Sequence, residues 1–246
     1  TIHAWDGTDG LRWGVSCIIN NRLCVGNLHY KGRHYPGDIC FTPPGKFDTF
    51  PIPEGIVRVN SEDGEDIVAL FSNGNRLLQF KYSWLYIINV ELIGQEIVEK
   101  TYKFKGAMKD IHICELETGF VWMNEHGVYF YDNDSGKISE LFLPSGKTTG
   151  KRVDLDTWKT FFNSNSIIGY DATRQQVIIK KSVSTNATSG DIYVYDFNTD
   201  SWSFGKKRFL NNSKTTNMVT LYNGELLAFR QGKVDDDLED GGEQPR

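Results

Sequence analysis

One strand–turn–strand pattern recurs along the chain and constrains its fold more than any other feature. In Gly190–Phe204, β-branched and aromatic residues alternate, then Asp, Asn and Ser supply a turn, and "WSF" begins a second strand. Trp84–Lys100 and Gly127–Leu141 run in the same order. All three place a tyrosine second in the first strand, namely Tyr86, Tyr129 and Tyr193. The pattern predicts three β-hairpins of one design.

An apolar run that follows a turn precedes each hairpin, and these runs recur at a blade-like spacing. The equivalent positions are Leu23, Leu77, Phe120, Val177 and Leu226, which lie 54, 43, 57 and 49 residues apart. Four short strands in a unit of this length are typical of β-propellers. The sequence therefore predicts an all-β fold: a β-propeller of five or six four-stranded antiparallel blades over residues 1–234.

The last unit is short, and its completion leaves two alternatives. Residues 235–246 are acidic and rich in glycine, so we expect a flexible tail or a link to a segment outside this chain. The blade is closed either by the N-terminal strand, within "TIHAWDG", or by residues outside the chain, because an open ring would expose two sheet edges.

Residues 154–165 fit the strand pattern worst. Trp158, Phe161 and Phe162 have helical spacing, and Asp156 or Thr157 is a candidate N-cap. This segment predicts one or two helical turns, with little helix elsewhere.

Composition argues against several classes of function. The net charge is -5 and the basic residues are scattered, so no basic stripe predicts direct, sequence-specific binding to nucleic acid. No apolar run reaches the roughly 18 residues that span a bilayer, so we expect no membrane contact. The four cysteines form no CxxC pair, which favours core residues in a reducing compartment over a zinc site: Cys17, Cys24, Cys40 and Cys114.

No motif predicts catalysis, a cofactor or a metal. The acidic stretches 132–136 and 196–201 resemble fragments of calcium loops, but they lie where hairpins must turn and lack the full spacing. The string "PSGKTTG" lacks the upstream glycine of a phosphate loop. The histidines show no metalloenzyme spacing: His3, His29, His34, His112 and His126. We therefore expect a protein that is not an enzyme.

Two insertions at one corner of the repeat are the candidate interaction loops. They span residues 29–37 and 182–190, and insertions of this kind commonly fall on the binding face of a repeat array. The candidate residues are His29, Tyr30, Lys31, Arg33, His34, Tyr35, Ser184, Thr185 and Asn186. Plain surface loops, and loops that bind glycans, stay open as alternatives.

Three stretches carry a resemblance to a known family. "NGNRLLQFKYSWLYIINV", "FFNSNSIIGYDATRQQVIIKK" and "GDIYVYDFNTDSW" together resemble the propeller-bearing tail nozzle or muzzle proteins of short-tailed bacteriophages. The end "YVYDFNTDSW" is also similar to a Kelch repeat. The resemblance covers roughly residues 55–230 and rests on strand and turn patterns.

The resemblance implies a structural, protein-interaction domain of a virion. Its partners would be other copies of itself around the tail axis, a portal-proximal adaptor, and tail fibre or tip proteins. The protein would assemble in the host cytoplasm. Nozzle proteins carry additional channel-forming strands, so this chain would correspond to their propeller portion, and the family offers no catalytic residues.

Two other classes remain open. One is a Kelch-like cellular interaction propeller, although the Kelch spacing is strong only once, at Tyr193 to Trp202. The other is a carbohydrate-binding or hydrolytic propeller, although the S-x-D-x-G-x-x-W box of sialidase blades is absent.

Overall fold

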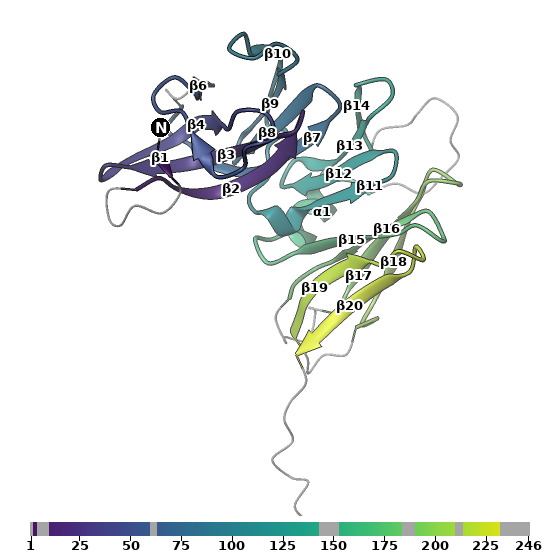
Figure 1. Cartoon of the computed structure of the whole chain (residues 1–246). Helices are drawn as coiled ribbons and strands as arrows, with labels where there is room; N and C mark the ends of the chain where they lie inside the picture. Colours follow the sequence, from purple (N-terminus) through teal and green to yellow (C-terminus); the bar gives the residue numbers. More distant parts are fainter. Residues whose placement is uncertain are drawn as a thin grey trace, which may run out of the picture. The chain divides into compact units, whose positions relative to one another are not determined.

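The computed structural model describes residues 2–3, 10–59, 63–142, 153–183, 190–209 and 214–231. The chain divides into two compact units, coloured along the sequence in Figure 1. The first unit is Thr1–Pro144 with Asp154–Ser164, and the second is Ser145–Val153 with Asn165–Arg246. Residues 235–246, expected as a tail or link, lie outside the described part.

The first unit contains three four-stranded antiparallel sheets, each joined in sequence order. Their strands are β2 (Arg12–Ile19), β3 (Arg22–Tyr30), β4 (Arg33–Phe41) and β6 (Ile56–Arg58); β7 (Ile67–Asn73), β8 (Arg76–Lys81), β9 (Trp84–Asn89) and β10 (Ile97–Lys103); and β11 (Ile113–Leu116), β12 (Gly119–Asn124), β13 (Gly127–Asp132) and β14 (Ile138–Glu140).

The second unit contains a fourth sheet of the same design and a pair of strands beside it. The sheet is β15 (Ile167–Asp171), β16 (Gln176–Lys180), β17 (Ile192–Asp196) and β18 (Ser201–Gly205), and the pair is β19 (Lys214–Thr220) and β20 (Leu226–Gln231). Gly169 of β15 lies so close to β19 that an added Cβ would be 2.8 Å from Cβ of Met218. The pair thus packs on β15 like the start of a fifth blade.

The predicted fold class is confirmed: the chain is an all-β, propeller-type structure of four-stranded antiparallel blades. The five equivalent positions fall on β3, β8, β12, β16 and β20, each of which is the second strand of its blade. The three matching tyrosines lie on the third strands and are buried. β9 and β13 are buried along most of their length, so their sequences run almost continuously apolar, whereas β17 alternates half-buried and buried residues.

Aromatic side chains fill the space between neighbouring blades of the first unit. Phe80 of β8 meets Trp122 of β12 edge to face, with ring centroids 5.2 Å apart. Phe71 and Phe120 lie 5.0 Å apart in the same cluster. Offset and edge-to-face aromatic pairs of this kind add to the gain from area burial.

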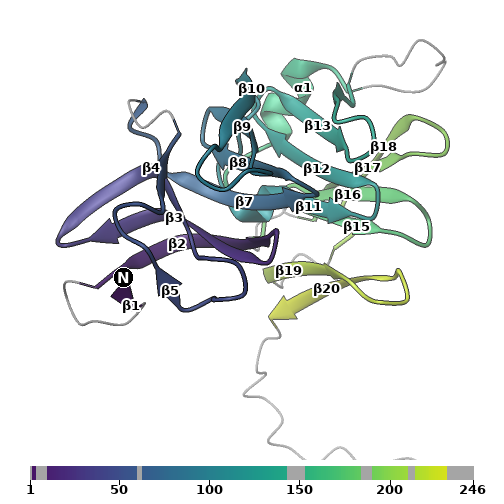
Figure 2. The same cartoon turned by 45° about the horizontal axis from the view of Figure 1, so that its top comes forward.

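The N-terminal strand does not close the last blade, so that expectation is wrong. β1 (Ile2–His3) pairs with the short β5 (Thr49–Phe50) within the first unit, with Ile2 opposite Phe50 (Figure 2). The Phe50 side chain is fully buried beside Leu11 and Val25. Pairing with β5 closes a shorter loop than pairing with the last blade would, and a shorter loop costs less entropy to close.

The predicted helix is present as α1 (Leu155–Phe161). Its N-cap is Asp154, not Asp156 or Thr157 as expected: the Asp154 Oδ1 accepts a hydrogen bond from the Thr157 amide at 2.9 Å. This is the reach of an Asp side chain to the third residue of a helix. A further helical turn is η3 (Asp110–His112).

Trp158 anchors α1 to the first unit. Its side chain is fully buried, and its indole Nε1 donates to the Asn124 carbonyl at 2.7 Å. Phe161 and Phe162 stack beside it, with ring centroids 5.7 Å away in both cases. The helical spacing of the three aromatic residues therefore places their side chains together in the core.

We predict that Trp158→Ala lowers the free energy of unfolding by about 3–5 kcal/mol, because it leaves a large cavity. The control Leu155→Ala, on the exposed side of α1, should change it by no more than about 0.5 kcal/mol. Urea unfolding followed by circular dichroism measures both. Equal effects of the two substitutions would contradict the anchoring role of Trp158.

Candidate functional site

The first candidate loop is a β-hairpin, so its interpretation as a loop is wrong. β3 and β4 extend through it, and Tyr30 pairs with Arg33 across a two-residue turn. Lys31 and Gly32 both have positive φ, 48° and 68°. This is the geometry that matches the right-handed twist of two-residue hairpins. The sequence signal was weak because lysine is unusual at such a position.

The six predicted residues of this hairpin tip lie together. The rings of His29 and His34 stack with centroids 4.2 Å apart. The His34 Nε2 is 2.5 Å from the Asn27 Oδ1 and 3.3 Å from the Asp66 Oδ1. The Lys31 Nζ lies over the Tyr30 ring, 5.2 Å from its centroid.

A shallow cavity of about 280 Å³ opens beside the tip. It is lined by Gly10, Arg12, His29, Tyr30 and Gly32. Imidazole, guanidinium and aromatic groups together suit contact with another macromolecule's polar surface. The tip remains a candidate interaction surface. The other predicted residues, Ser184, Thr185 and Asn186, lie outside the described residues.

The acidic stretches behave as turns. The Asp132 Oδ1 accepts from the amides of Asp134 and Ser135, and the Asp196 Oδ1 accepts from those of Asn198 and Thr199. The turn interpretation is confirmed, because each carboxylate is used by its own backbone. Within the described ranges, no three His, Cys, Asp or Glu side chains could hold a metal ion.

The cysteines are free thiols, and Cys24 and Cys40 are buried in the core. Burial raises the pKa of the Cys40 thiol to about 12. A thiol in such surroundings stays protonated and unreactive.

A buried ion pair holds the segment before β7. The Lys81 ammonium is fully buried and lies 2.7 and 2.9 Å from the two carboxylate oxygens of Asp63. The Tyr86 hydroxyl donates to the same carboxylate at 3.3 Å. Buried charges are tolerated when paired and hydrogen-bonded in this way. The cluster is therefore structural.

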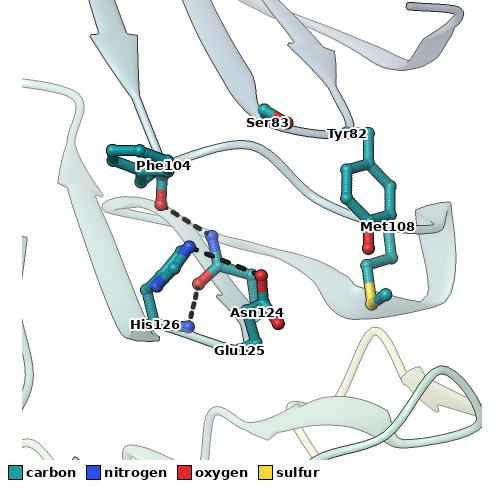
Figure 3. Close-up of a pocket in the computed structure, with 7 residues that line it drawn as sticks. All are labelled: Tyr82, Ser83, Phe104, Met108, Asn124, Glu125 and His126. Carbon is teal, nitrogen blue, oxygen red and sulfur yellow. Dashed lines mark hydrogen bonds and ion pairs between the residues drawn. The ribbon is translucent and has the colours of Figure 1, made fainter.

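A pocket of about 150 Å³ lies in the first unit between three neighbouring turns (Figure 3). Tyr82 and Ser83 come from the β8–β9 turn, and Glu125 and His126 come from the β12–β13 turn. The remaining lining residues are Phe104, Met108 and Asn124. The His126 Nε2 lies 3.5 Å from the Glu125 Oε1.

Asn124 organises this pocket. Its Nδ2 donates to the Phe104 carbonyl at 3.0 Å and to the Gly106 carbonyl at 2.9 Å. Its Oδ1 accepts from the His126 amide at 2.8 Å. One buried amide thus fixes the segment after β10 and the β12–β13 turn, and all its main hydrogen-bonding sites are used.

Most of this pocket is not predicted by the sequence. The sequence singles out only His126, as one of five histidines. Asn124 at the end of an apolar strand and Gly106 in "KFKGAM" were the available signals. Neither has a spacing that points to a ligand, because the pocket is assembled by the packing of two blades.

No family model and no curated protein matches this chain. Among solved structures, it is similar to the extracellular domain of the "putative one component system BT4673" of B. thetaiotaomicron, with 18% identity and a TM-score of 0.51. The match covers 87% of this chain and 25% of that one, so this chain spans about a quarter of its length. The likeness bears on the fold.

Two further structures show weaker likeness. One is the same extracellular domain described as a hybrid two component system, with 18% identity, coverage of 87% and 24%, and a TM-score of 0.49. The other is Kluyvelomyces marxianus Hsv2, with 11% identity, coverage of 86% and 57%, and a TM-score of 0.48. No helix among the described residues is long and apolar enough to cross a membrane.

His112 is fully buried beside Phe162. Burial, with a smaller effect from Lys109, lowers the pKa of His112 from 6.5 to about 4. Its stabilising effect is therefore complete above pH 6.5 and is lost as the pH falls toward 4.

We predict that protonation of His112 lowers the free energy of unfolding by roughly 3 kcal/mol as the pH falls from 6.5 to 4. His112→Leu should remove that part of the pH dependence, and His126→Leu, an exposed control, should leave it. Urea midpoints across this pH range measure the effect. An unchanged pH profile in His112→Leu would contradict it.

Proposed function

We propose that the chain is a structural, protein-interaction propeller domain of a bacteriophage tail that associates with copies of itself. The observation that carries the interaction role is the apolar outer edge of the β7–β10 sheet. A role in the virion is the more specific proposal, and it is supported by the resemblance of three sequence stretches to tail nozzle proteins. The propeller fold is compatible with this role, as it is with many others.

β10 is the last strand of its sheet and pairs only with β9 among the described strands. Six of its seven residues are exposed. At its start, four large apolar side chains are 43–63% exposed: Leu92, Ile93, Ile97 and Val98. An exposed apolar edge strand is a template for pairing with another chain.

The middle of β10 has a different character. Glu99 accepts from the Arg76 Nε at 2.7 Å, and the Lys100 Nζ donates to the Gly136 carbonyl at 3.2 Å. Glu99 is thus engaged with its own blade, and Lys100 with the β13–β14 turn of the neighbouring blade. Charged residues on an edge oppose uncontrolled pairing. Contact with another copy would therefore use residues 92–98.

The hairpin tip of β3 and β4 would supply a second contact surface, for the adaptor or for fibre and tip proteins. Its basic and aromatic side chains suit an acidic or amide-rich surface. A cellular Kelch-like role would use the same surfaces, but it requires no copies arranged around an axis.

We predict that the protein self-associates and that Val98→Lys weakens the association at least tenfold, because a buried unpaired ammonium is costly. The control Thr101→Lys, later on the same strand, should have little effect. Light scattering coupled to size-exclusion chromatography, over a concentration series, gives the association state. A wild-type protein that stays monomeric throughout would contradict the proposed self-association.

The virion role requires a separate experiment. Particles purified by density from the natural source should contain peptides of this chain at a fixed ratio to the capsid protein. Peptide mass spectrometry measures that ratio. Absence of the peptides from DNA-filled particles would rule out the tail role and leave the cellular interaction role.

A further inference from the structure

We propose that the pocket between Tyr82 and Phe104 binds a sugar ring of a carbohydrate. This goes beyond the proposed structural function and does not depend on it. The inference rests on the display of two aromatic side chains, the polar groups between them, and the rigid backbone that holds both (Figure 3).

Phe104 is held in a conformation that its side chain does not favour. Its φ is +64°, in the left-handed region that bulky residues avoid. The residue is nevertheless 53% exposed, so burial does not compensate for the strain. Strain of this kind persists only where surrounding structure imposes it, and it concentrates at ligand sites.

The surrounding structure does impose it. Asn124 donates to the carbonyls on both sides of Lys105, and the Trp122 Nε1 donates to the Lys105 carbonyl at 2.9 Å. A Cβ added at Gly106 would lie 2.2 Å from the Lys81 carbonyl oxygen, so this segment packs directly on the β8–β9 turn. These contacts fix the backbone of Phe104, and the His126 ring meets the Phe104 ring edge to face, with centroids 5.1 Å apart.

Tyr82 provides the second aromatic surface. Figure 3 shows its ring beside Met108, across the pocket from Phe104. Tyr82 is 48% exposed. The Lys103 Nζ lies over the Phe104 ring, 5.1 Å from its centroid. The exposed parts of the Tyr82 and Phe104 rings suit the apolar C–H face of a pyranose, and the adaptable Met108 side chain suits its rim.

Polar groups with open capacity lie between these surfaces. The Glu125 side chain is 58% exposed, and its carboxylate can accept from two neighbouring hydroxyls. The hydroxyls of Tyr82 and Ser83 can each donate and accept, as can the hydroxyls of a sugar. Aromatic walls with a few convergent polar groups are the usual composition of a ligand site.

The same composition disfavours other ligands. No lysine or arginine lines the pocket in the described residues, and the Lys103 ammonium lies over the Phe104 ring, so a phosphate or carboxylate would lack a cationic partner in the lining itself. The volume of about 150 Å³ is below that of sites for drug-sized ligands. An organic ammonium, held by Glu125 and the aromatic rings, is the competing class.

Saturation-transfer difference NMR on the full chain tests the proposal. The probes are methyl glucoside, methyl galactoside, methyl mannoside, rhamnose, N-acetylglucosamine and N-acetylgalactosamine, each at about 10 mM, where a Kd of ~1 mM would give high occupancy. We expect at least one probe to bind. Tyr82→Ala and Phe104→Gly should each weaken that binding at least tenfold.

Phe104→Gly separates binding from folding. Glycine accepts a φ of +64° without strain, so this variant should have an unchanged or higher Tm while it loses the sugar. The matched control is Phe47→Ala, which removes another half-exposed phenylalanine and should bind as the wild type does.

Four outcomes would overturn the proposal. They are no binding of any probe, equal binding by the wild type and both pocket variants, a large drop in the Tm of Phe104→Gly, or displacement of a bound sugar by tetramethylammonium at equal concentration. The third outcome would make Phe104 a packing residue, and the fourth would assign the pocket to cations.

Discussion

Face-to-face burial of the second and third strands is the constraint on which the rest of this structure depends. A single four-stranded sheet leaves two apolar faces, so each blade needs a neighbour on both sides. In the first unit this burial brings Phe80 against Trp122 and Phe71 against Phe120. The fourth strands need not be buried between blades. For this reason β10 can present an exposed surface while β9 beside it is buried.

The blade repeat was predictable because its signals are local. Alternation along a strand and the Asp132 and Asp196 turns depend on residues a few positions apart, so a single sequence reveals them. The pairing of β1 with β5 was not predictable, because a two-residue strand carries almost no pattern. The Lys31–Gly32 turn was not predictable for a different reason. Lys31 has a positive φ, which lysine seldom adopts, so the residue type does not indicate the turn.

The pocket illustrates the limit of sequence reasoning for function. Its lining comes from three segments that only the packing of two blades brings together. The positive φ of Phe104 is imposed by Asn124, Trp122 and Gly106. None of these contacts follows from spacing along the chain. By contrast, the hairpin tip of β3 and β4 was found because its residues are consecutive.

Asn124 has a second role through its backbone. Its side chain holds the two segments that form the pocket, while its carbonyl accepts the indole hydrogen of Trp158, which anchors α1. Occupancy of the pocket and docking of α1 therefore share one residue. Any ligand that tightens the geometry around Asn124 would also favour the docked helix, and by thermodynamic reciprocity undocking of the helix would weaken the ligand. The first unit thus contains a physical connection between a surface site and an internal anchor.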